Sequence, residues 1–370
     1  MLLCVFAVIA CRGGETAPAR DGGDTISFRY SRLLTAIRYA DHVLVQVADP
    51  WHKGKILHQY ALVTDSAGVA GLPLDATVVK VPLRRCVPLS TVHASLMVSL
   101  GVGEFVAGVA DMQYVKVPYI RERYRSGTVA DVGSSMSPDI ERIVSLTPDA
   151  IFASPFDNSG GYGPLEEMGV PVIECADYME TSALGRAEWI RFYGMLFGKE
   201  RLADSLFAAI DSSYNSIKAK AAMANNGKSL VMDKMTGSVW YMPGGRSTIG
   251  TIIADANAGY AFSDTDASGS LSLSFETVLS KSGDADFWLL RYSGKTPASY
   301  SDLVSENRGY GEMRAFKLRQ CYGCNVEKSL FYEETPFRPD WLLADFVRIV
   351  HPEVLPAWRM RYFHPLADGN

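Results

Sequence analysis

One long amphipathic segment, Lys199–Ala224, dominates the pattern of apolar and polar positions along the chain. It contains neither Gly nor Pro, and its apolar side chains recur every three or four residues: Leu202, Leu206, Ile210, Tyr214, Ile217 and Ala221. This spacing places one apolar face along a helix. We predict a single continuous helix of roughly 39 Å, because each residue adds about 1.5 Å. Asn225-Asn226-Gly227 is a suitable C-terminal stop.

A shared pattern lies on either side of this helix, in residues 141–152 and 276–287. Both stretches start with Glu and continue with a β-branched residue, an aliphatic residue and Ser at the same offsets. A turn former, Asp-Ala and Phe then follow in the same order. Each predicts a short helix, a tight turn and a buried strand, with the strands at Ala150–Ser154 and Phe287–Tyr292. The repeat favours two similar, separately folded α/β lobes, although a chance likeness of two such units is the alternative.

The N-terminal residues predict export from the cytoplasm. Met1–Ala10 is apolar but too short for a mature membrane span, and it ends in a small residue before Cys11. We interpret 1–11 as a lipoprotein signal peptide with Cys11 as the lipidated residue, and 12–25 as a flexible tether. No Lys or Arg precedes the apolar run, so an unlipidated leader or a plain apolar end remains an alternative. Short alternating runs over 26–64 predict a small antiparallel β-unit.

Composition narrows the function classes. A length of 370 residues fits two domains, and a net charge of −5 without a basic run argues against nucleic acid as a partner. The chain lacks a Gly-x-Ser-x-Gly elbow, a phosphate-binding Gly-Lys-Ser/Thr loop and a His-Glu-x-x-His motif. Its six His residues do not fall at metal-ligand spacing. Cys321 and Cys324 have redox or zinc spacing without a second pair, so a local disulfide or two plain thiols is expected. This pattern favours binding over catalysis and predicts no metal site.

Candidate binding residues follow the predicted strands, where ligands bind in open α/β sheets. We predict a cleft lined by Ser90, Thr91, Phe156, Trp240, Tyr241, Gly244, Gly245, Arg246, Arg291 and Tyr292. The aromatic residues would stack on a large ligand, and the arginines would pair with its oxygens. Arg186 is a further candidate that could instead anchor a helix end. A plain helix cap at Ser90 and an ordinary turn at Gly244-Gly245 are the structural alternatives.

Several short motifs together resemble one protein family. They occur in this order: Val81-Pro82, Ser90-Thr91, Val132-Gly133, the 141–149 stretch, Gly169-Val-Pro-Val172, Gly244-Gly245, Ser274-Phe-Glu276-Thr-Val-Leu279, Pro339-Asp340 and His351-Pro352. The set covers roughly residues 78–352 and resembles the substrate-binding proteins of ABC importers for iron–siderophores, haem and cobalamin. The resemblance implies an α/β fold of two lobes, each with a central, mainly parallel sheet flanked by helices, joined by one long rigid helix. The expected parts are an N-terminal lobe (26–185), a helical linker (186–226), a C-terminal lobe (227–340) and a C-terminal helix and tail (341–370).

The same resemblance implies what the protein binds. The ligand would be a metal chelate (ferric siderophore, haem or cobalamin) with no intrinsic cofactor. The partners would be an ABC permease and its ATPase, which receive the ligand from a monomer anchored on the periplasmic side of a membrane. Glu276 and either Glu166 or Glu167 are the expected permease-docking acids. A two-lobed envelope enzyme and a purely structural lipoprotein are the rival interpretations.

Overall fold

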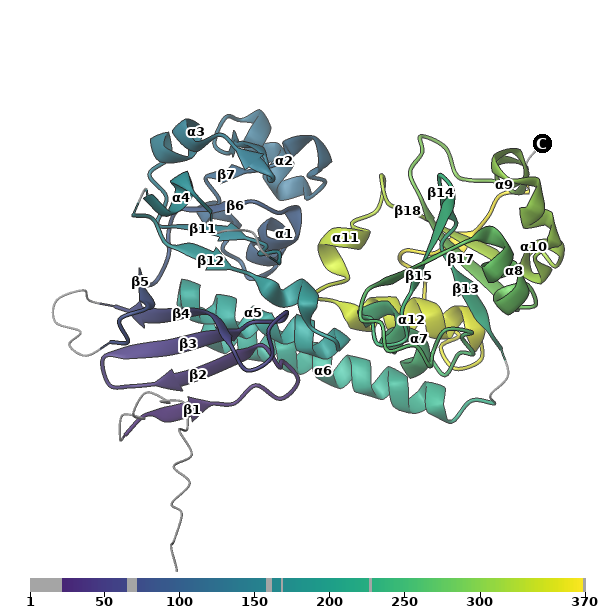
Figure 1. Ribbon diagram of the computed structural model, residues 1–370, viewed down its shortest axis with the longest axis horizontal. Coiled ribbons are helices and arrows are strands. Elements are labelled where there is room, and N and C mark those ends of the chain that lie inside the picture. The colour runs from purple at the N-terminus through teal and green to yellow at the C-terminus, as the bar shows by residue number, and fades with distance from the viewer. Residues whose placement is uncertain (1–21, 65–71, 158–161, 168, 226–227, 369–370) are drawn as a thin grey trace, which may run out of the picture.

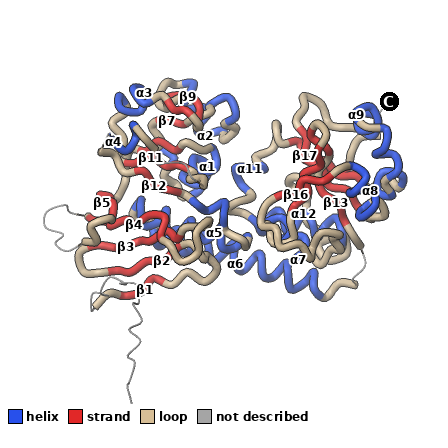
Figure 2. The backbone as a smooth tube through the Cα atoms, viewed as in Figure 1, coloured by secondary structure: helices blue, strands red, loops and turns tan. Residues whose placement is uncertain are grey.

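The computed structural model describes residues 22–64, 72–157, 162–167, 169–225 and 228–368. Two α/β lobes stand side by side, and the helix α6 (Glu200–Ala222) runs beneath both of them (Figure 1). The strands fall into separate groups in the two lobes, with helices between and around them (Figure 2). The predicted fold class is confirmed. Cys11 and the rest of the proposed signal peptide lie outside the described residues.

The N-terminal lobe is built on a short parallel sheet in the order β12 (Val172–Glu174), β11 (Ala150–Ala153) and β6 (Cys86–Pro88). All residues of these strands are buried, which explains the continuous apolar run of β11. A bridge from Cys86 to Val106 extends the sheet toward a second parallel pair. The remaining elements of this lobe are α1 (Thr91–Ser99), η1 (Gly103–Phe105), β7 (Gly108–Val109), η2 (Met112–Tyr114), α2 (Pro118–Arg125), β8 (Ala130–Asp131), β9 (Gly133–Ser134), β10 (Ser137–Pro138), α3 (Ile140–Ser145), α4 (Pro164–Glu167) and η3 (Ala176–Met179).

The N-terminal β-unit is larger than the predicted 26–64. It is a five-stranded sheet of β1 (Asp24–Ile26), β2 (Leu34–Arg38), β3 (His42–Ala48), β4 (Ile56–Val63) and β5 (Ala76–Lys80). The first four strands are antiparallel, whereas β5 pairs in parallel with β4. β5 is the next strand along the chain, but it lies beyond the predicted range and is parallel to β4, which differs from the antiparallel pattern expected of this unit.

The C-terminal lobe has a four-stranded sheet in the order β13 (Leu230–Met232), β17 (Phe287–Tyr292), β18 (Cys321–Asn325) and β19 (His364–Pro365). The first three strands are parallel, and β19 is antiparallel to β18. The predicted tail is therefore part of this sheet. A second, antiparallel sheet and five helices complete the lobe: β14 (Met235–Thr236), β15 (Val239–Pro243), β16 (Ser270–Leu273), α7 (Thr248–Asp255), α8 (Phe275–Ser282), α9 (Tyr300–Glu306), η4 (Arg308–Glu312) and α10 (Arg314–Lys317).

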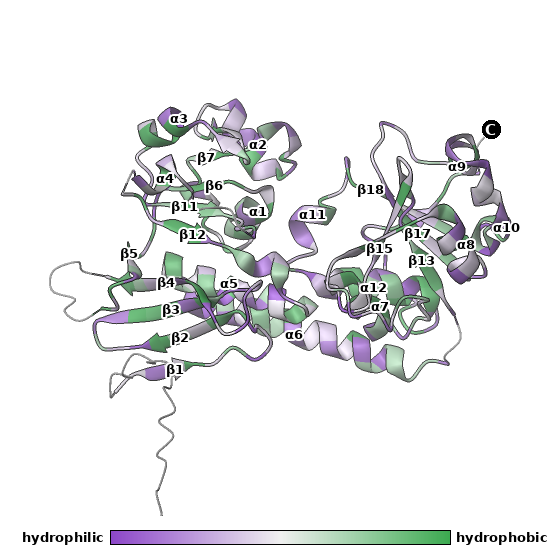
Figure 3. Cartoon of the chain, in the orientation of Figure 1, coloured by the Kyte–Doolittle hydropathy of each residue, from purple (hydrophilic) through white to green (hydrophobic). Residues whose placement is uncertain are grey.

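Two further helices reinforce the connection made by α6. The helix α5 (Ala183–Phe197) packs along α6 on the N-terminal side, and α12 (Pro339–Val350) packs on α6 and α7 on the other. Hydrophobic and hydrophilic residues alternate along α6 (Figure 3), and its apolar residues Phe207, Ile210 and Tyr214 are buried. None of the helices in the described part of the chain is long and apolar enough to span a bilayer.

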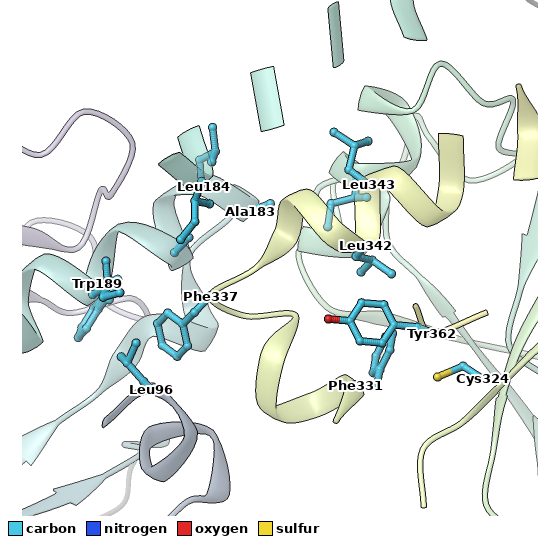
Figure 4. Close-up of a cluster of buried hydrophobic side chains, with 14 of the residues drawn as sticks. Leu96, Ala183, Leu184, Trp189, Cys324, Phe331, Phe337, Leu342, Leu343 and Tyr362 are labelled. Atoms are coloured by element: carbon cyan, nitrogen blue, oxygen red, sulfur yellow. The ribbon is translucent and has the colours of Figure 1, made fainter. Parts of the chain in front are cut away.

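The hydrophobic core runs from one lobe into the other. Leu96 and Trp189 lie on the N-terminal side, Phe331 and Tyr362 lie on the C-terminal side, and Phe337 lies between them (Figure 4). Phe337 precedes α12, and the short helix α11 (Phe331–Glu334) packs against α1 of the opposite lobe. The two repeat units belong to separate sheets, one in each lobe, and the lobes also share apolar contacts that the sequence did not predict. Apolar burial at several points, in addition to α6, holds the lobes together.

Candidate functional site

A cavity of about 690 Å³ lies at the carboxyl edge of the N-terminal parallel sheet. Its wall includes the residues that follow three strands: Ser90 after β6, Asp111 after β7 and Ser154 after β11. We call it the N-lobe cavity. Ser90 is the N-cap of α1 and accepts a hydrogen bond from the Val92 amide at 3.2 Å. The predicted site residues Ser90, Thr91 and Phe156 all line this cavity.

Large apolar side chains border the N-lobe cavity while remaining in contact with solvent. Tyr114, Met136 and Phe156 are 67%, 78% and 51% exposed. Met136 lies in the turn between β9 and β10, and Phe156 lies in the loop after β11. Scattered exposed apolar residues are normal, but several around one cavity indicate a binding surface.

A second cavity of about 380 Å³ lies at the carboxyl edge of the C-terminal sheet. We call it the C-lobe cavity. Its wall includes the predicted residues Tyr241, Arg291 and Tyr292, and also Tyr332 from α11. Tyr241 and Tyr332 are each 45% exposed. Exposed aromatic side chains therefore border a cavity in each lobe, at equivalent edges of the two parallel sheets.

One polar contact connects the N-terminal lobe to the wall of the C-lobe cavity. Lys116, which follows η2 in the N-terminal lobe, donates a hydrogen bond to the Val326 carbonyl of the C-lobe cavity. Its ammonium also lies 3.8 Å from the buried Glu333 carboxylate of α11. Burial raises the pKa of Glu333, and the charge of Lys116 partly offsets that effect. Lys116 thus brings a charge of the N-terminal lobe to the edge of the C-lobe cavity.

Arg291 is paired with a carboxylate inside its own lobe. Its guanidinium makes two hydrogen bonds to Asp233, at 2.8 and 2.5 Å, and lies over the rings of Phe331 and Tyr332. Burial would lower the pKa of Arg291, but the bonds and charge of Asp233 outweigh burial and raise it. Because the Asp233 carboxylate accepts both of these bonds, Arg291 lines the cavity but does not offer an unpaired positive charge to a ligand.

Trp240 does not belong to the site. It is 0% exposed, and its indole donates a hydrogen bond to the Met232 carbonyl at 2.9 Å. Its ring packs against Trp288, Tyr310 and Phe275. In strand β15 alternate residues face inward, so Trp240 enters the core and Tyr241 faces the cavity. The prediction that Trp240 contacts a ligand is corrected accordingly.

The Gly244-Gly245-Arg246 loop also has a structural role. A Cβ at Gly244 or Gly245 would lie 2.3 Å from the Ala267 carbonyl or 2.1 Å from the Ser263 carbonyl. The glycines therefore allow the segment 263–269 to pack closely against this loop. Arg246 pairs with Asp266 at 2.9 Å on the surface. None of the three lines either cavity.

Arg186 anchors a buried carboxylate at the start of α5. Its Nε donates to Asp177 at 2.8 Å, and His93 lies 3.3 Å from the other Asp177 oxygen. Burial alone would raise the pKa of Asp177, but Arg186 and His93 hold it below its usual value. The structure therefore favours the helix-anchoring alternative for Arg186 over ligand binding.

The expected docking acids have different surroundings. Glu276 is exposed as the second residue of α8, after the N-cap Ser274. Glu141 is exposed at the equivalent position of α3, after the N-cap Asp139. Glu167 is exposed at the end of the four-residue helix α4, whereas the side chain of Glu166 is outside the description. The structural repeat therefore pairs Glu276 with Glu141.

Of the two alternatives for Cys321 and Cys324, the structure has two plain thiols rather than a local disulfide. Cys321 and Cys324 are free thiols, and burial raises the pKa of Cys321 to about 12 and that of Cys324 to about 11. Thiols with raised pKa values are poor nucleophiles and poor metal ligands. Across the described ranges no group of three or more His, Cys, Asp or Glu residues could hold a metal ion.

Several residues that line the cavities were not predicted from the sequence. They are Asp111, Tyr114 and Met136 in the N-lobe cavity, and Lys234 and Tyr332 in the C-lobe cavity. Tyr114 and Met136 lie in a one-turn helix and a two-residue turn, which have no apolar period. Tyr332 follows β18 by several residues and reaches the site through α11. The position of Asp111 just after a short apolar run was the one available signal.

Comparisons with known proteins identify the family and the fold. Residues 88–326 match the family model described as periplasmic binding protein. An uncharacterised lipoprotein of Methanocaldococcus jannaschii is 25% identical over 304 residues, covering 77% of this chain and 69% of that protein.

Solved structures share the fold at low sequence identity. A possible iron-binding, periplasmic solute-binding protein from Staphylococcus epidermidis matches with a TM-score of 0.59 and 19% identity, covering 73% of this chain and 100% of that one. The periplasmic haem-binding protein RhuT from Roseiflexus, in apo form, matches with a TM-score of 0.59 and 20% identity, covering 73% and 99%. With the family model matching well over half of its length, the chain belongs to the periplasmic binding protein family.

Proposed function

We propose that this protein captures a metal chelate between its two lobes and delivers it to an ABC importer. The observation that carries the proposal is the pair of cavities with exposed aromatic borders, one at the carboxyl edge of each parallel sheet. The family and its structural neighbours are solute-binding proteins rather than enzymes. The names of the two solved structures refer to iron and haem, which supports a chelate of a transition metal as the cargo.

The proposed ligand would contact both aromatic borders. Aromatic rings offer large, rigid apolar surfaces to a planar or bulky chelate. The contact of Lys116 with the wall of the C-lobe cavity suits a site that ligand and inter-lobe contacts share. Because α5, α6, α12 and the shared core connect the lobes, we expect ligand binding to cause only a small closure.

Truncating an aromatic border residue tests this proposal. We expect Phe156→Ala and Tyr241→Ala each to weaken chelate binding by about 1–3 kcal/mol, as for residues that pack on a bound partner. Isothermal titration with haem and ferric siderophores measures the change. Tyr124→Ala, which removes an exposed aromatic ring from α2 outside both cavities, is the matched control. Equal losses in all three variants, or no loss at Phe156 and Tyr241, would count against the proposed site.

We also propose that Cys11 carries a lipid that holds the chain at the periplasmic side of a membrane, as a monomer. The lipoprotein name of the Methanocaldococcus relative supports this anchor. Because β1 begins at Asp24, a tether could not extend to residue 25 as predicted. A lipid anchor would keep the binding protein near its permease, and the residues before β1 would let it turn toward that partner.

Docking on the permease is expected to depend on Glu276. A single exposed ion pair contributes only about 0–1 kcal/mol, so one acid on each lobe would set orientation rather than produce tight binding. Glu276→Lys should reduce chelate-stimulated ATPase activity of the importer strongly while leaving chelate affinity unchanged. Glu141→Lys and Glu167→Lys, tested in parallel, identify the partner acid on the first lobe. Glu312→Lys, at an exposed acid elsewhere on the C-terminal lobe, is the control. If Glu276→Lys lowers chelate affinity as well as ATPase stimulation, Glu276 is not a docking residue.

A further inference from the structure

The cations around the two cavities are already paired with carboxylates of the protein. Arg291 forms its two bonds with Asp233, and Lys234 pairs with Glu306. Lys116 is bonded to the Val326 carbonyl and faces Glu333. An anionic ligand would have to displace one of these carboxylates, or its negative charge would have no positive partner in the site. Removing one partner of a largely buried ion pair is costly because the other charge is left behind.

The N-lobe cavity has an acidic character instead. The described residues of its wall include no Lys, Arg or His, and Asp111 is its one charged side chain. Several hydroxyl groups accompany it, from Ser90, Ser135, Ser137 and Ser154. The segments between residues 65 and 227 that lie outside the description contain no Lys or Arg in the sequence, so they add no cation.

The carboxylate of Asp111 is not used as a helix cap. Asp111 precedes η2 in a left-handed backbone conformation (φ 52°, ψ 42°), and its side chain makes no capping hydrogen bond. One oxygen accepts from the Ser135 amide at 3.2 Å, and no other described group donates to this carboxylate. Asp at an N-cap commonly accepts from the first turn of its helix. Here the carboxylate retains capacity for a donor inside the cavity.

We propose that the site selects a chelate without net negative charge, and that Asp111 accepts a hydrogen bond from an N–H or ammonium group of that chelate. This inference rests on the proposed function and narrows its ligand class. Three hydroxamates neutralise a ferric ion, whereas three catecholates leave a strongly anionic complex. Haem has two propionates that also need cations or water. A ferric trihydroxamate, above all one with a free ammonium group, therefore fits the charges of this site.

Titration with ferric complexes of different charge tests the inference. The probes are a neutral ferric trihydroxamate, a trihydroxamate with a free ammonium group, a ferric tris-catecholate and haem. We expect the trihydroxamates to bind at least about tenfold more tightly than the tris-catecholate, because like charges placed together in a binding site are strongly unfavourable. Isothermal titration at one fixed salt concentration gives the four affinities.

Variants of Asp111 show how far chelate affinity depends on the charge of this side chain and how far on its shape. Asp111→Asn keeps a residue that tolerates the left-handed conformation. It should weaken the ammonium-bearing complex about tenfold, as expected for loss of a hydrogen bond to a charged group, and the neutral complex less. Asp111→Lys should raise the affinity for the tris-catecholate. Glu122→Gln, which removes an exposed carboxylate from α2 of the same lobe, should change none of these affinities. Thermal unfolding confirms that each variant is folded.

The possible results distinguish the inference from the function on which it rests. Tris-catecholate or haem binding as tightly as the trihydroxamates would overturn the charge selection and leave a chelate-binding protein. An unchanged affinity of folded Asp111→Asn for the ammonium-bearing complex would overturn the role of Asp111. Absence of binding for all four complexes would overturn the proposed function itself, and the inference with it.

Discussion

Phe337→Ala is expected to lower the free energy of unfolding by about 3–5 kcal/mol, the usual cost of emptying a buried aromatic site. Phe337 is 4% exposed and lies where the apolar core passes from the N-terminal to the C-terminal lobe. Its ring lies between Leu96 and Trp189 on one side and Tyr362 on the other (Figure 4). The cavity left by the truncation would weaken the packing of the two lobes against each other.

Denaturant unfolding followed by two probes measures this effect. The wild type should unfold in one cooperative transition, since its core is shared. Phe337→Ala should lower the midpoint and separate the transitions of the two lobes. Phe156→Ala removes the same side chain from an exposed position and should cost less than about 1 kcal/mol. Equal stability of Phe337→Ala and the wild type would mean that the shared core does not connect the lobes energetically.

Arg186→Met should also cost about 3–5 kcal/mol at neutral pH, because it leaves the buried Asp177 carboxylate without its main cation. The folded-state pKa of Asp177 lies below its usual value. The pair therefore contributes stability above the unfolded-state pKa, near 4, and this contribution is lost as the pH falls through the folded-state pKa. The difference between Arg186→Met and the wild type should shrink on acidification.

Unfolding curves at several pH values test this prediction, with chelate affinity measured beside them. Arg186→Lys keeps a charge and should recover part of the stability, but not the full geometry of the guanidinium. The folded variant should bind chelate with little change. If Arg186→Met is as stable as the wild type but binds chelate poorly, Arg186 is a ligand-binding residue, as first considered from the sequence.

The features that sequence reasoning predicted well are local ones. The period of apolar residues in α6 and the repeated helix-turn-strand pattern at 141 and 276 follow from neighbouring residues alone. Ser90, Phe156 and Tyr241 were found because they follow predicted strands, and Arg291 and Tyr292 because they end one. Such positions lie at one edge of a parallel sheet.

The errors arose where distant segments meet. The sequence shows Arg291 as a free cation, yet its partner Asp233 lies 58 residues away. Likewise, β19 joins its sheet by pairing with β18, from which α11 and α12 separate it in the sequence. Trp240 was misplaced because neighbouring residues of the short strand β15 face opposite sides, so that Tyr241 reaches the cavity and Trp240 is buried. Pairing and burial of this kind depend on tertiary contacts that no local pattern contains.

Native mass spectrometry tests the central claim most directly, that the lobes hold a metal chelate between them. The folded chain is mixed with ferric trihydroxamates, a ferric tris-catecholate, haem and cobalamin together. We predict a complex of one chain with one chelate, and its loss in a Phe156→Ala, Tyr241→Ala double variant that remains folded. A chain that retains no chelate from this mixture, or one whose complex survives unchanged in the double variant, would contradict the account.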